Sequence, residues 1–172
     1  MTTLTILEFP DPRLRTIAEP VTEFNSTLAE LVQNMLETMY DAPGVGLAAP
    51  QVGSLHRLFV MDCTGKEEDA APMVLINPKV VWTSEETSVY NEGCLSIPEM
   101  YEDVERPERA VMQFLDIDGV EREQEFDGLW ATCAQHELDH LNGVLFIDYL
   151  SGLKRRMITK KMMKLKKERA RG

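Results

Sequence analysis

The chain has few of the residues that build covalent or metal-linked frameworks: three cysteines and three histidines among 172 residues. Three cysteines make a poor disulfide framework, so we expect reduced thiols and a cytoplasmic protein. No apolar run approaches the roughly 20 residues of a membrane-spanning helix. The N-terminus also lacks a basic segment followed by an apolar run, so no secretory signal and no membrane partner are expected.

The overall composition is that of an ordinary globular protein, with 44% hydrophobic and 27% charged residues. A chain of this length can bury roughly 70% of the surface that its unfolded form exposes. No internal repeat or low-complexity segment is visible. We therefore predict that residues 1–172 form a single domain.

The net charge of −11 is unevenly distributed. Residues 154–172 hold ten Lys or Arg and one acid, a charge of +9, whereas residues 1–153 carry −20. The acidic body argues against broad nucleic-acid binding, and no DNA partner is expected. The basic C-terminal segment is either a solvated helix face or a local contact for nucleic acid.

Three segments have the apolar spacing of helices. Residues 25–44 have apolar side chains at helical intervals, with Thr27 and Glu30 at the spacing of a capping box. Asp127 is expected to cap a second helix that ends before Asn142-Gly143. The basic segment continues an apolar stripe and is expected to form an amphipathic helix; the stripe comprises Leu150, Leu153, Met157, Ile158, Met162 and Leu165.

The middle of the chain reads as strands. Residues 57–63, 73–82 and 86–93 are strand-like, the second interrupted by Asn-Pro, and residues 109–126 predict a hairpin that turns at Asp118-Gly119. Residues 44–53, "GVGLAAPQVG", are too rich in glycine for regular structure to be expected there. This order of elements favours an α+β fold with antiparallel sheets.

The segment "CAQHELDHLNG" (133–143) carries the clearest chemistry. On a helix, His136 and His140 lie on one face and can bind one metal ion. Glu137, next to the first ligand, is placed to take and return a proton, as in other H-E-x-x-H sites. The alternative is that two histidines with no metal-binding role share this spacing by chance. This is disfavoured because the chain has only one other histidine.

A third ligand is needed, and the cysteines compete for that role. Cys133 and His140 are seven residues apart, on the order of 10 Å along a helix, too far for bonds of about 2 Å to one ion. Cys63 ends a hydrophobic strand and reads as a core residue. Cys94 lies in the irregular segment "NEGCLSIPE" and is favoured over Cys133, since irregular segments tend to carry function.

Three segments together resemble the peptide deformylase family: "GVGLAAPQVG" (44–53), "EGCLSIP" (92–98) and "QHELDH" (135–140). The likeness extends from residue 6 to residue 156. It implies removal of the formyl group from the N-terminal formylmethionine of new proteins. It also implies antiparallel sheets packed around the metal-binding helix, with one helix before them and an amphipathic helix after them.

The resemblance also implies roles for individual residues. It makes Cys94, His136 and His140 the metal ligands, Glu137 the acid–base residue, and the Gln51 amide and the Leu95 N–H the donors to the formyl oxygen. Gly44 and Gly46 would let the substrate peptide approach the backbone of Val45 and Gly46. An apolar pocket for the methionine side chain would be lined by Val45, Leu129 and Cys133.

The resemblance implies Fe(II) as the metal, with Zn, Ni or Co as possible substitutes; the ligand set by itself suits zinc. It implies that N-formylmethionyl nascent peptides are the substrates. It also makes a contact between the basic helix and the ribosome a reasonable expectation. Glu92 is either a partner of a ligand histidine or a solvent-facing carboxylate, and Asp139 either pairs with Arg106 or is a surface charge. The sequence departs from the family at "MYED" (100–103), where members often carry an Arg near Tyr101.

Two rival functions remain open on the residues alone. An H-E-x-x-H metalloprotease would take its third ligand downstream, where Asp148 and Glu168 are the only carboxylates after His140. A ribosome-binding module with a structural metal would need a closed four-ligand site and would leave Glu137 and Gln51 without a role.

Overall fold

A computed structural model of the chain describes residues 2–65 and 67–171. Residues 1, 66 and 172, which belong to the predicted domain and in the last case to the predicted basic helix, lie outside the described residues. The described residues form helices α1 (Ser26–Asp41), α2 (Gly128–Leu141) and α3 (Gly152–Arg171), and short 3₁₀ segments η1 (Pro12–Arg15), η2 (Ala49–Val52) and η3 (Phe146–Tyr149). The strands are β1 (Gly46–Ala48), β2 (Leu58–Met61), β3 (Met73–Thr83), β4 (Thr87–Cys94), β5 (Ile97–Pro107), β6 (Arg109–Leu115) and β7 (Glu121–Asp127).

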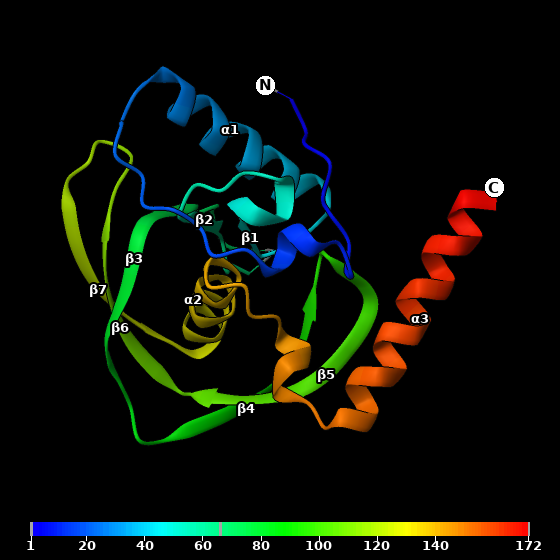
Figure 1. Cartoon of the computed structure of the whole chain (residues 1–172). Coiled ribbons are helices and arrows are strands. Elements are labelled where there is room, and N and C mark those ends of the chain that lie inside the picture. Colours follow the sequence, from blue (N-terminus) through cyan, green and yellow to red (C-terminus); the bar gives the residue numbers. More distant parts are fainter. Residues whose placement is uncertain (1, 66, 172) are drawn as a thin grey trace.

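The strands surround helix α2. A five-stranded antiparallel sheet has the order β1-β2-β3-β6-β7, and β4 and β5 form a separate two-stranded antiparallel ribbon. Figure 1 shows α2 in the middle of the molecule, with the larger sheet and the β4–β5 ribbon around it. The predicted α+β fold with antiparallel sheets around the histidine-bearing helix is confirmed.

Both faces of the larger sheet are covered near β2, which explains why all four residues of β2 are buried. Alternate side chains of a strand point to opposite faces. Leu58 and Val60 accordingly pack with α1, while Phe59 and Met61 pack with α2. The sheet therefore holds α2, and with it the two histidines, between apolar surfaces.

The start of α1 differs from the prediction. The side chain of Asn25, rather than that of Thr27, caps the helix by accepting a hydrogen bond from the Leu28 N–H at 3.0 Å. Asn and Thr are both favoured at this position, and an Asn oxygen in front of Ser26 reaches the free N–H groups of the first turn. The capping box of Thr27 and Glu30 was therefore wrong by two residues.

The glycine-rich segment is regular, contrary to the prediction. Residues Gly46–Ala48 form β1, paired with β2 in the register Gly46↔Met61, and Ala49–Val52 form the 3₁₀ turn η2. Glycine weakens a strand but is used where another group approaches the backbone closely. Residue 46 is such a place, because a Cβ there would lie 2.8 Å from a Glu137 carboxylate oxygen.

The predicted turn at Asp118-Gly119 is confirmed: it joins β6 to β7, and Gly119 has φ 79°. The Asn-Pro of residues 77–78 does not end β3. The strand continues past it with a shift of register between Ile76 and Lys79, and the Asn77 side chain bonds both backbone groups of Val21. A bulge thus absorbs the proline, which has no N–H to offer to the ladder.

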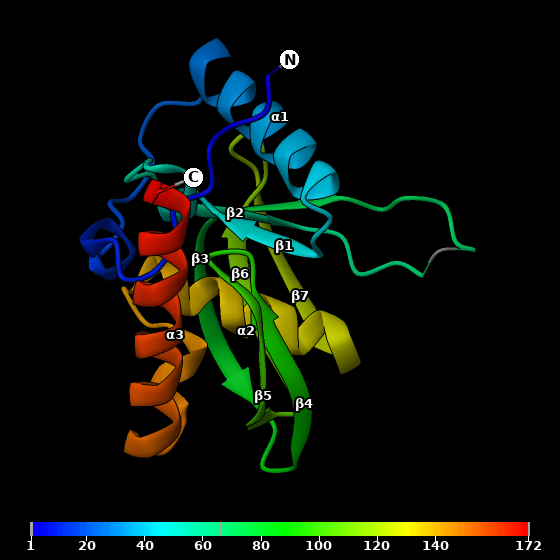
Figure 2. The same cartoon turned by 90° about the vertical axis from the view of Figure 1, so that its right-hand side faces the viewer.

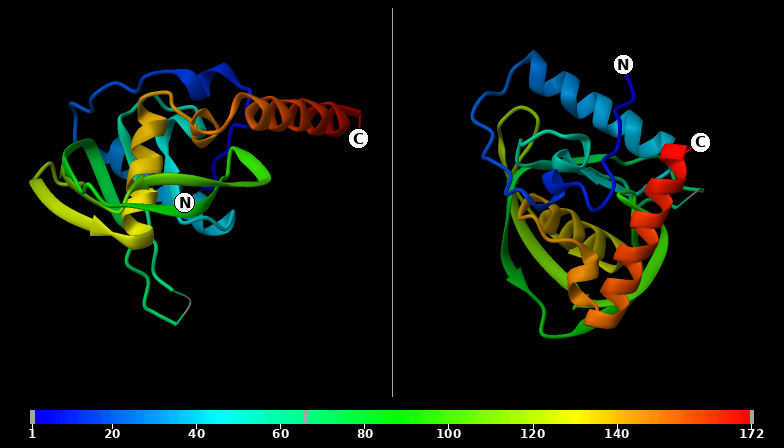
Figure 3. Two further views of the ribbon diagram at one scale, coloured as in Figure 1. Left: turned by 90° about the horizontal axis from the view of Figure 1, so that it is seen from below. Right: turned by 45° about the vertical axis from the view of Figure 1, so that its right-hand side comes forward.

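Helix α3 forms as predicted and runs along one side of the molecule (Figure 2). Ile158 and Met162 are buried in a cluster with Phe9 and Leu14. Two residues of the predicted apolar stripe are exposed: Leu153 by 63% and Met157 by 50%. Only part of the stripe is therefore buried against the rest of the chain. Helix α3 projects beyond the sheets at its C-terminal end (Figure 3).

Within the described part of the chain, no helix combines the length and the apolar character that crossing a bilayer requires.

Candidate metal centre and active-site pocket

Helix α2 carries the two histidines, as predicted. Asp127 occupies the N-cap position, but its side chain makes no capping hydrogen bond, which corrects the prediction of a side-chain cap. At the other end, Asn142 follows the helix and Gly143 has φ 74°, so the predicted stop is confirmed. The rings of His136 and His140 lie one turn apart with centroids separated by 5.0 Å.

Cys94 meets these histidines from the β4–β5 ribbon. It is the last residue of β4, and a two-residue turn places Ile97 opposite it on β5. Its Sγ lies 3.3 Å from His140 Nε2, and one ligand atom from each of Cys94, His136 and His140 lies within 4.8 Å of the others. Among the described residues this is the one group of three or more His, Cys, Asp or Glu side chains spaced to hold a metal ion.

Cys133 stays out of this cluster. Its thiol points at the Val45 carbonyl oxygen, 3.6 Å away, and packs with the half-buried Cys63. The hydrogen bond with Cys63 and burial raise the pKa of the Cys133 thiol well above its usual value. The structure therefore brings together Cys94, rather than Cys133, with the histidines.

The polar atoms around the cluster fit a metal ion. His136 Nδ1 lies 3.0 Å from a carboxylate oxygen of Glu92, which leaves Nε2 to face the cluster, 3.9 Å from Glu137 Oε1. A ligand histidine commonly gives its other nitrogen to such a carboxylate. The other oxygen of Glu137, Oε2, is buried beside Gly46 without a hydrogen-bond partner among the described residues.

Glu92 is held in turn by Arg106. The guanidinium makes two bonds to the Glu92 carboxylate, at 2.7 and 3.0 Å, and one to Asp139 at 2.9 Å. Tyr149 donates to the same Asp139 oxygen at 2.7 Å. Glu92 is thus a partner of His136 rather than a solvent-facing carboxylate, and the Asp139–Arg106 ion pair is present.

Glu137 lies at the floor of the cluster. Its Oε1 is 3.9 Å from His136 Nε2 and from His140 Nε2, and its side chain is almost wholly buried. Burial raises the pKa of Glu137 to about 7, against the opposing influence of His136 and Arg106. A carboxyl group with a pKa near neutrality can both accept and release a proton.

The side-chain amide of Gln51 faces the same cluster from η2. Its Oε1 accepts the Ala48 N–H at 2.9 Å, which orients the NH₂ group toward Ser96 Oγ, 3.0 Å away, and Cys94 Sγ, 3.5 Å away. Leu95 and Ser96 form the turn between β4 and β5, so the backbone of Leu95 lies directly after Cys94. Ser96 was not singled out from the sequence, although it lies within "EGCLSIP".

A pocket of about 670 Å³ opens over these residues. It contains all the predicted substrate-binding positions (Gly44, Val45, Gly46, Leu129 and Cys133) together with Gln51, Cys94, Leu95, His136 and Glu137. His140 is buried and is not among the lining residues. The pocket is also lined by Tyr90, Glu99, Tyr101 and Thr132, which the sequence did not identify as lining residues. Nothing local in the sequence places them beside the helix.

The carboxylates that a metalloprotease would use are engaged elsewhere. Asp148 pairs with Arg15 at 2.6 Å and accepts the Leu145 N–H at 3.0 Å, while Glu168 is an exposed residue of α3. The third side chain of the cluster comes from upstream, at Cys94.

The chain is similar to known deformylases over nearly its whole length. The family model for polypeptide deformylase matches residues 3–156. A peptide deformylase of Afipia carboxidovorans is 54% identical over 162 residues, covering 94% of this chain and 95% of that protein. The crystal structure of a peptide deformylase from Legionella pneumophila superposes with a TM-score of 0.91 at 45% identity, covering 99% of both chains.

A peptide deformylase from Ehrlichia chaffeensis, solved in complex with actinonin, superposes with a TM-score of 0.91 at 40% identity and covers 95% of this chain and 98% of its own. The extent of these matches, together with a Cys-His-His cluster and a buried glutamate in one pocket, assigns the chain to the polypeptide deformylase family.

Proposed function

We propose that Cys94, His136 and His140 hold one divalent metal ion and that Glu137 carries the proton during hydrolysis of the formyl group. The reaction itself follows from the family: the chain is a metal-dependent hydrolase that removes the formyl group from N-formylmethionyl nascent peptides and releases formate. The observation that carries the assignment is the cluster of three donor atoms within 4.8 Å beside the buried Glu137 carboxylate.

A divalent metal at this position would supply Lewis acidity and a water of pKa near 7 as nucleophile. Glu137, with its own pKa raised to about 7 by burial, would accept the proton of that water. The same carboxyl group would then deliver the proton to the leaving amine of the methionine. The buried, apolar setting of Glu137 supports both halves of this transfer.

Gln51 and Leu95 would stabilise the charge that develops on the formyl oxygen. Preorganised N–H donors at such an oxygen are commonly the largest single contribution to catalysis. The Gln51 amide is already oriented by Ala48, so its NH₂ group points toward the cluster without further ordering. The Leu95 N–H belongs to the turn that immediately follows Cys94.

The edge of β1 would hold the backbone of the substrate peptide. β1 is the end strand of its sheet, and the Val45 carbonyl is turned inward to accept the Asp62 N–H at 2.8 Å. Because successive backbone groups point to opposite sides of a strand, the N–H and C=O of Gly46 face the open edge. The exposed side chains of Val45 and Leu129, with Cys133 behind them, would receive the methionine side chain.

Release of formate from a formyl-Met-Ala-Ser peptide tests this assignment. We expect turnover by the metal-loaded protein and loss of about 10²–10⁴-fold in kcat for Glu137→Ala, the usual worth of a general acid–base group. Glu125→Ala on the exposed end of β7 serves as the matched control and should behave as the parent protein. Retention of most of the activity by Glu137→Ala would contradict the assignment.

Fe(II) is the proposed native metal. Thiolate and imidazole ligands accept several divalent first-row metals, so the ligands alone do not discriminate among Fe, Zn, Ni and Co. Metal content should be measured in anaerobically purified protein alongside activity. Full activity with stoichiometric zinc and little with iron would exclude Fe(II) as the working metal.

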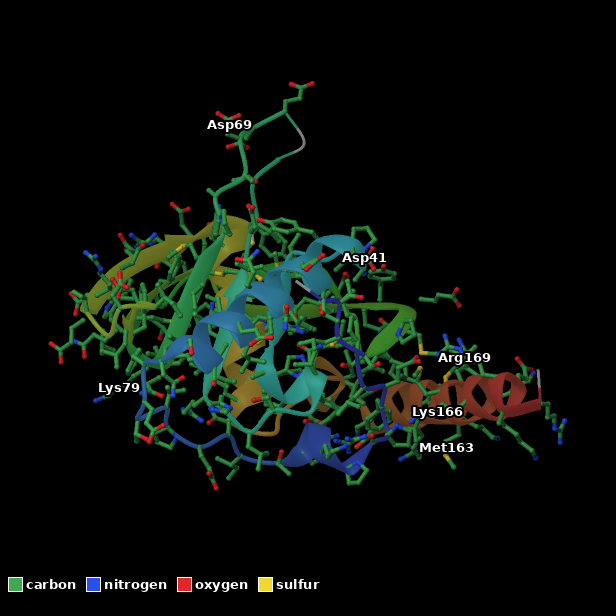
Figure 4. The ribbon with its side chains drawn as sticks, turned by 90° about the horizontal axis from the view of Figure 1, so that it is seen from above. Asp41, Asp69, Lys79, Met163, Lys166 and Arg169 are labelled. Atoms are coloured by element: carbon green, nitrogen blue, oxygen red, sulfur yellow. The ribbon has the colours of Figure 1, made fainter. Side chains whose placement is uncertain are left out.

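We also propose that residues 1–172 act as one catalytic domain in the cytoplasm and that α3 contacts ribosomal RNA. The exposed residues Lys160, Lys161, Lys164 and Lys167 supply the charge for RNA phosphates. Lys166 and Arg169, labelled in Figure 4, instead hold Glu8 of the N-terminal segment.

Because Ile158 and Met162 of α3 are buried, deletion of the helix would disturb the fold as well as any RNA contact. Replacing the four exposed lysines with glutamine is the sharper test of ribosome binding. We expect weaker binding and a shallower dependence of affinity on salt, whereas unchanged affinity would remove the proposal. The acidic body gives no support for a DNA partner.

A further inference from the structure

The mouth of the active-site pocket is acidic. Among the described residues that line the pocket there is no lysine or arginine. The acidic and histidine residues of the lining are Glu92, Glu99, His136 and Glu137. Glu92 and Glu137 are buried, the former bonded to Arg106, whereas Glu99 is exposed and makes no ion pair with any described residue. A peptide that leaves the pocket therefore meets one unneutralised carboxylate.

Glu99 has an unusual backbone conformation. Its φ of 65° lies in the left-handed region, which is uncommon for residues other than glycine, asparagine and aspartate. Such a conformation has a free-energy cost and is found most often at functional sites and turns. Here it occurs at a residue whose side chain lines the pocket.

Tyr101 forms an aromatic wall beside Glu99. Both residues line the pocket, in the stretch of β5 between Ile97 and Glu102 where the pairing with β4 is irregular. The ring of Tyr101 lies over Gly93 on β4, since a Cβ at residue 93 would clash with Tyr101 Cε1. The ring is nevertheless 64% exposed and lines the pocket, so one face is open to a bound peptide.

We propose that Glu99 and Tyr101 form a subsite that selects a positively charged side chain directly after the formylmethionine of the substrate. A lysine or arginine there would pair its charge with the Glu99 carboxylate and lay its stem or guanidinium on the Tyr101 ring. The proposal rests on the proposed function, because the peptide must enter with its formyl group at the metal cluster.

An exposed ion pair and an exposed cation–π contact each contribute modestly, so a preference of about three- to tenfold in kcat/KM is expected. The contribution of Glu99 should weaken with salt, since exposed charges are screened over about 10 Å at 0.1 M ionic strength. The contribution of the Tyr101 ring should persist.

The test measures kcat/KM for formyl-Met-Lys-Ser, formyl-Met-Ala-Ser and formyl-Met-Glu-Ser, and for the same set with the charge one position later. For each protein, kcat/KM for the lysine peptide is divided by kcat/KM for the alanine peptide and by kcat/KM for the glutamate peptide. Both ratios are measured at low and at high salt. The variants are Glu99→Asn, which removes the charge and suits a positive φ, Glu99→Gln, and Tyr101→Leu, which keeps an apolar side chain over Gly93.

Glu102→Gln is the matched control, because Glu102 lies on the same strand but pairs with Lys154 at 3.1 Å and does not line the pocket. We expect the lysine preference to fall toward one in both Glu99 variants, to shrink in Tyr101→Leu and to be unchanged in Glu102→Gln. Equal rates for the lysine, alanine and glutamate peptides in the unmodified protein at low salt would overturn the proposal, and so would a lysine preference that appears only when the charge stands one position later. A preference that survives in both Glu99 variants would do the same. No turnover of the alanine peptide would instead overturn the proposed function, so the two failures are distinguishable.

Discussion

Replacing Gly46 with alanine should disable Glu137 while leaving the metal ligands in place. A Cβ at residue 46 would lie 2.8 Å from Glu137 Oε2 and 2.7 Å from Cys133 Sγ, well inside van der Waals contact. The Gly46 backbone is held in β1 by its neighbour Val45, whose carbonyl accepts the Asp62 N–H, so the Glu137 carboxylate must move. None of the three nearest atoms belongs to Cys94, His136 or His140.

A displacement of about 1 Å in a catalytic group commonly costs on the order of 100-fold in rate. That corresponds to about 2.7 kcal/mol of transition-state stabilisation, at about 1.36 kcal/mol per tenfold. Overpacking in a buried site costs about 1–3 kcal/mol of folding stability, which a domain of this size can tolerate. We therefore expect folded, metal-loaded Gly46→Ala protein with kcat for formate release about 100-fold below the parent.

A double-mutant cycle with Glu137→Ala identifies the displaced group. If the added methyl acts through Glu137, Gly46→Ala should cost little in the Glu137→Ala background, because the group that it displaces is absent. Gly46→Ala combined with Cys133→Ala tests the other contact, and relief of the defect there would assign it to the thiol. Metal content measured on every variant separates both effects from loss of the ion. A Gly46→Ala protein within twofold of the parent would refute the reasoning.

Three further predictions concern two groups beside the site and a tyrosine of α1. Glu92→Gln should weaken metal binding by about 10- to 100-fold, measured by chelator competition, because the carboxylate orients His136. Arg106→Met should destabilise the fold by about 3–5 kcal/mol in urea unfolding, since it leaves Glu92 buried without its cation; a loss below about 1 kcal/mol would contradict this. Burial and the hydrogen bond to Asp62 raise the pKa of Tyr40 to about 12, so the stability that this proton contributes below pH 10 should be lost as pH rises toward 12. Tyr40→Phe should show a smaller loss in that range, and unfolding curves at pH 8, 10 and 11.5 compare the two proteins.

The half of the site that lies on α2 could be predicted because it is local. The spacing of His136 and His140 and the place of Glu137 follow from 3.6 residues per turn, and α2 bears out that geometry. The exclusion of Cys133 also followed from helix length. The place of Cys94 in the cluster could not be predicted from the residues alone; it needed the family resemblance or the structure. Its contact with His140 depends on how the β4–β5 ribbon packs against α2.

The errors occurred where tertiary contacts override local preference. The strand β1 was missed because glycine weakens strands, yet here β2 supplies a partner and Glu137 requires a residue without a side chain. Glu99 was missed because a positive φ cannot be read from a glutamate. The exposed part of the α3 stripe could not be foreseen either, since its apolar spacing does not say how much of the stripe meets the body.

The buried ions behind the cluster determine how its two halves are aligned. Glu92 precedes Cys94 by two residues on β4 and contacts His136 on α2, while Arg106 on β5 bonds both Glu92 and Asp139 of α2. Buried ion pairs add little net stability compared with apolar packing, because the desolvation of both partners offsets their attraction. What this network supplies is geometry. It ties the ribbon that carries Cys94 to the helix that carries His136 and His140, with their three donor atoms within 4.8 Å of one another. An apolar replacement of Glu92 and Arg106 together should therefore leave stability nearly unchanged while lowering metal affinity, and loss of both in proportion would show that the network acts through folding alone.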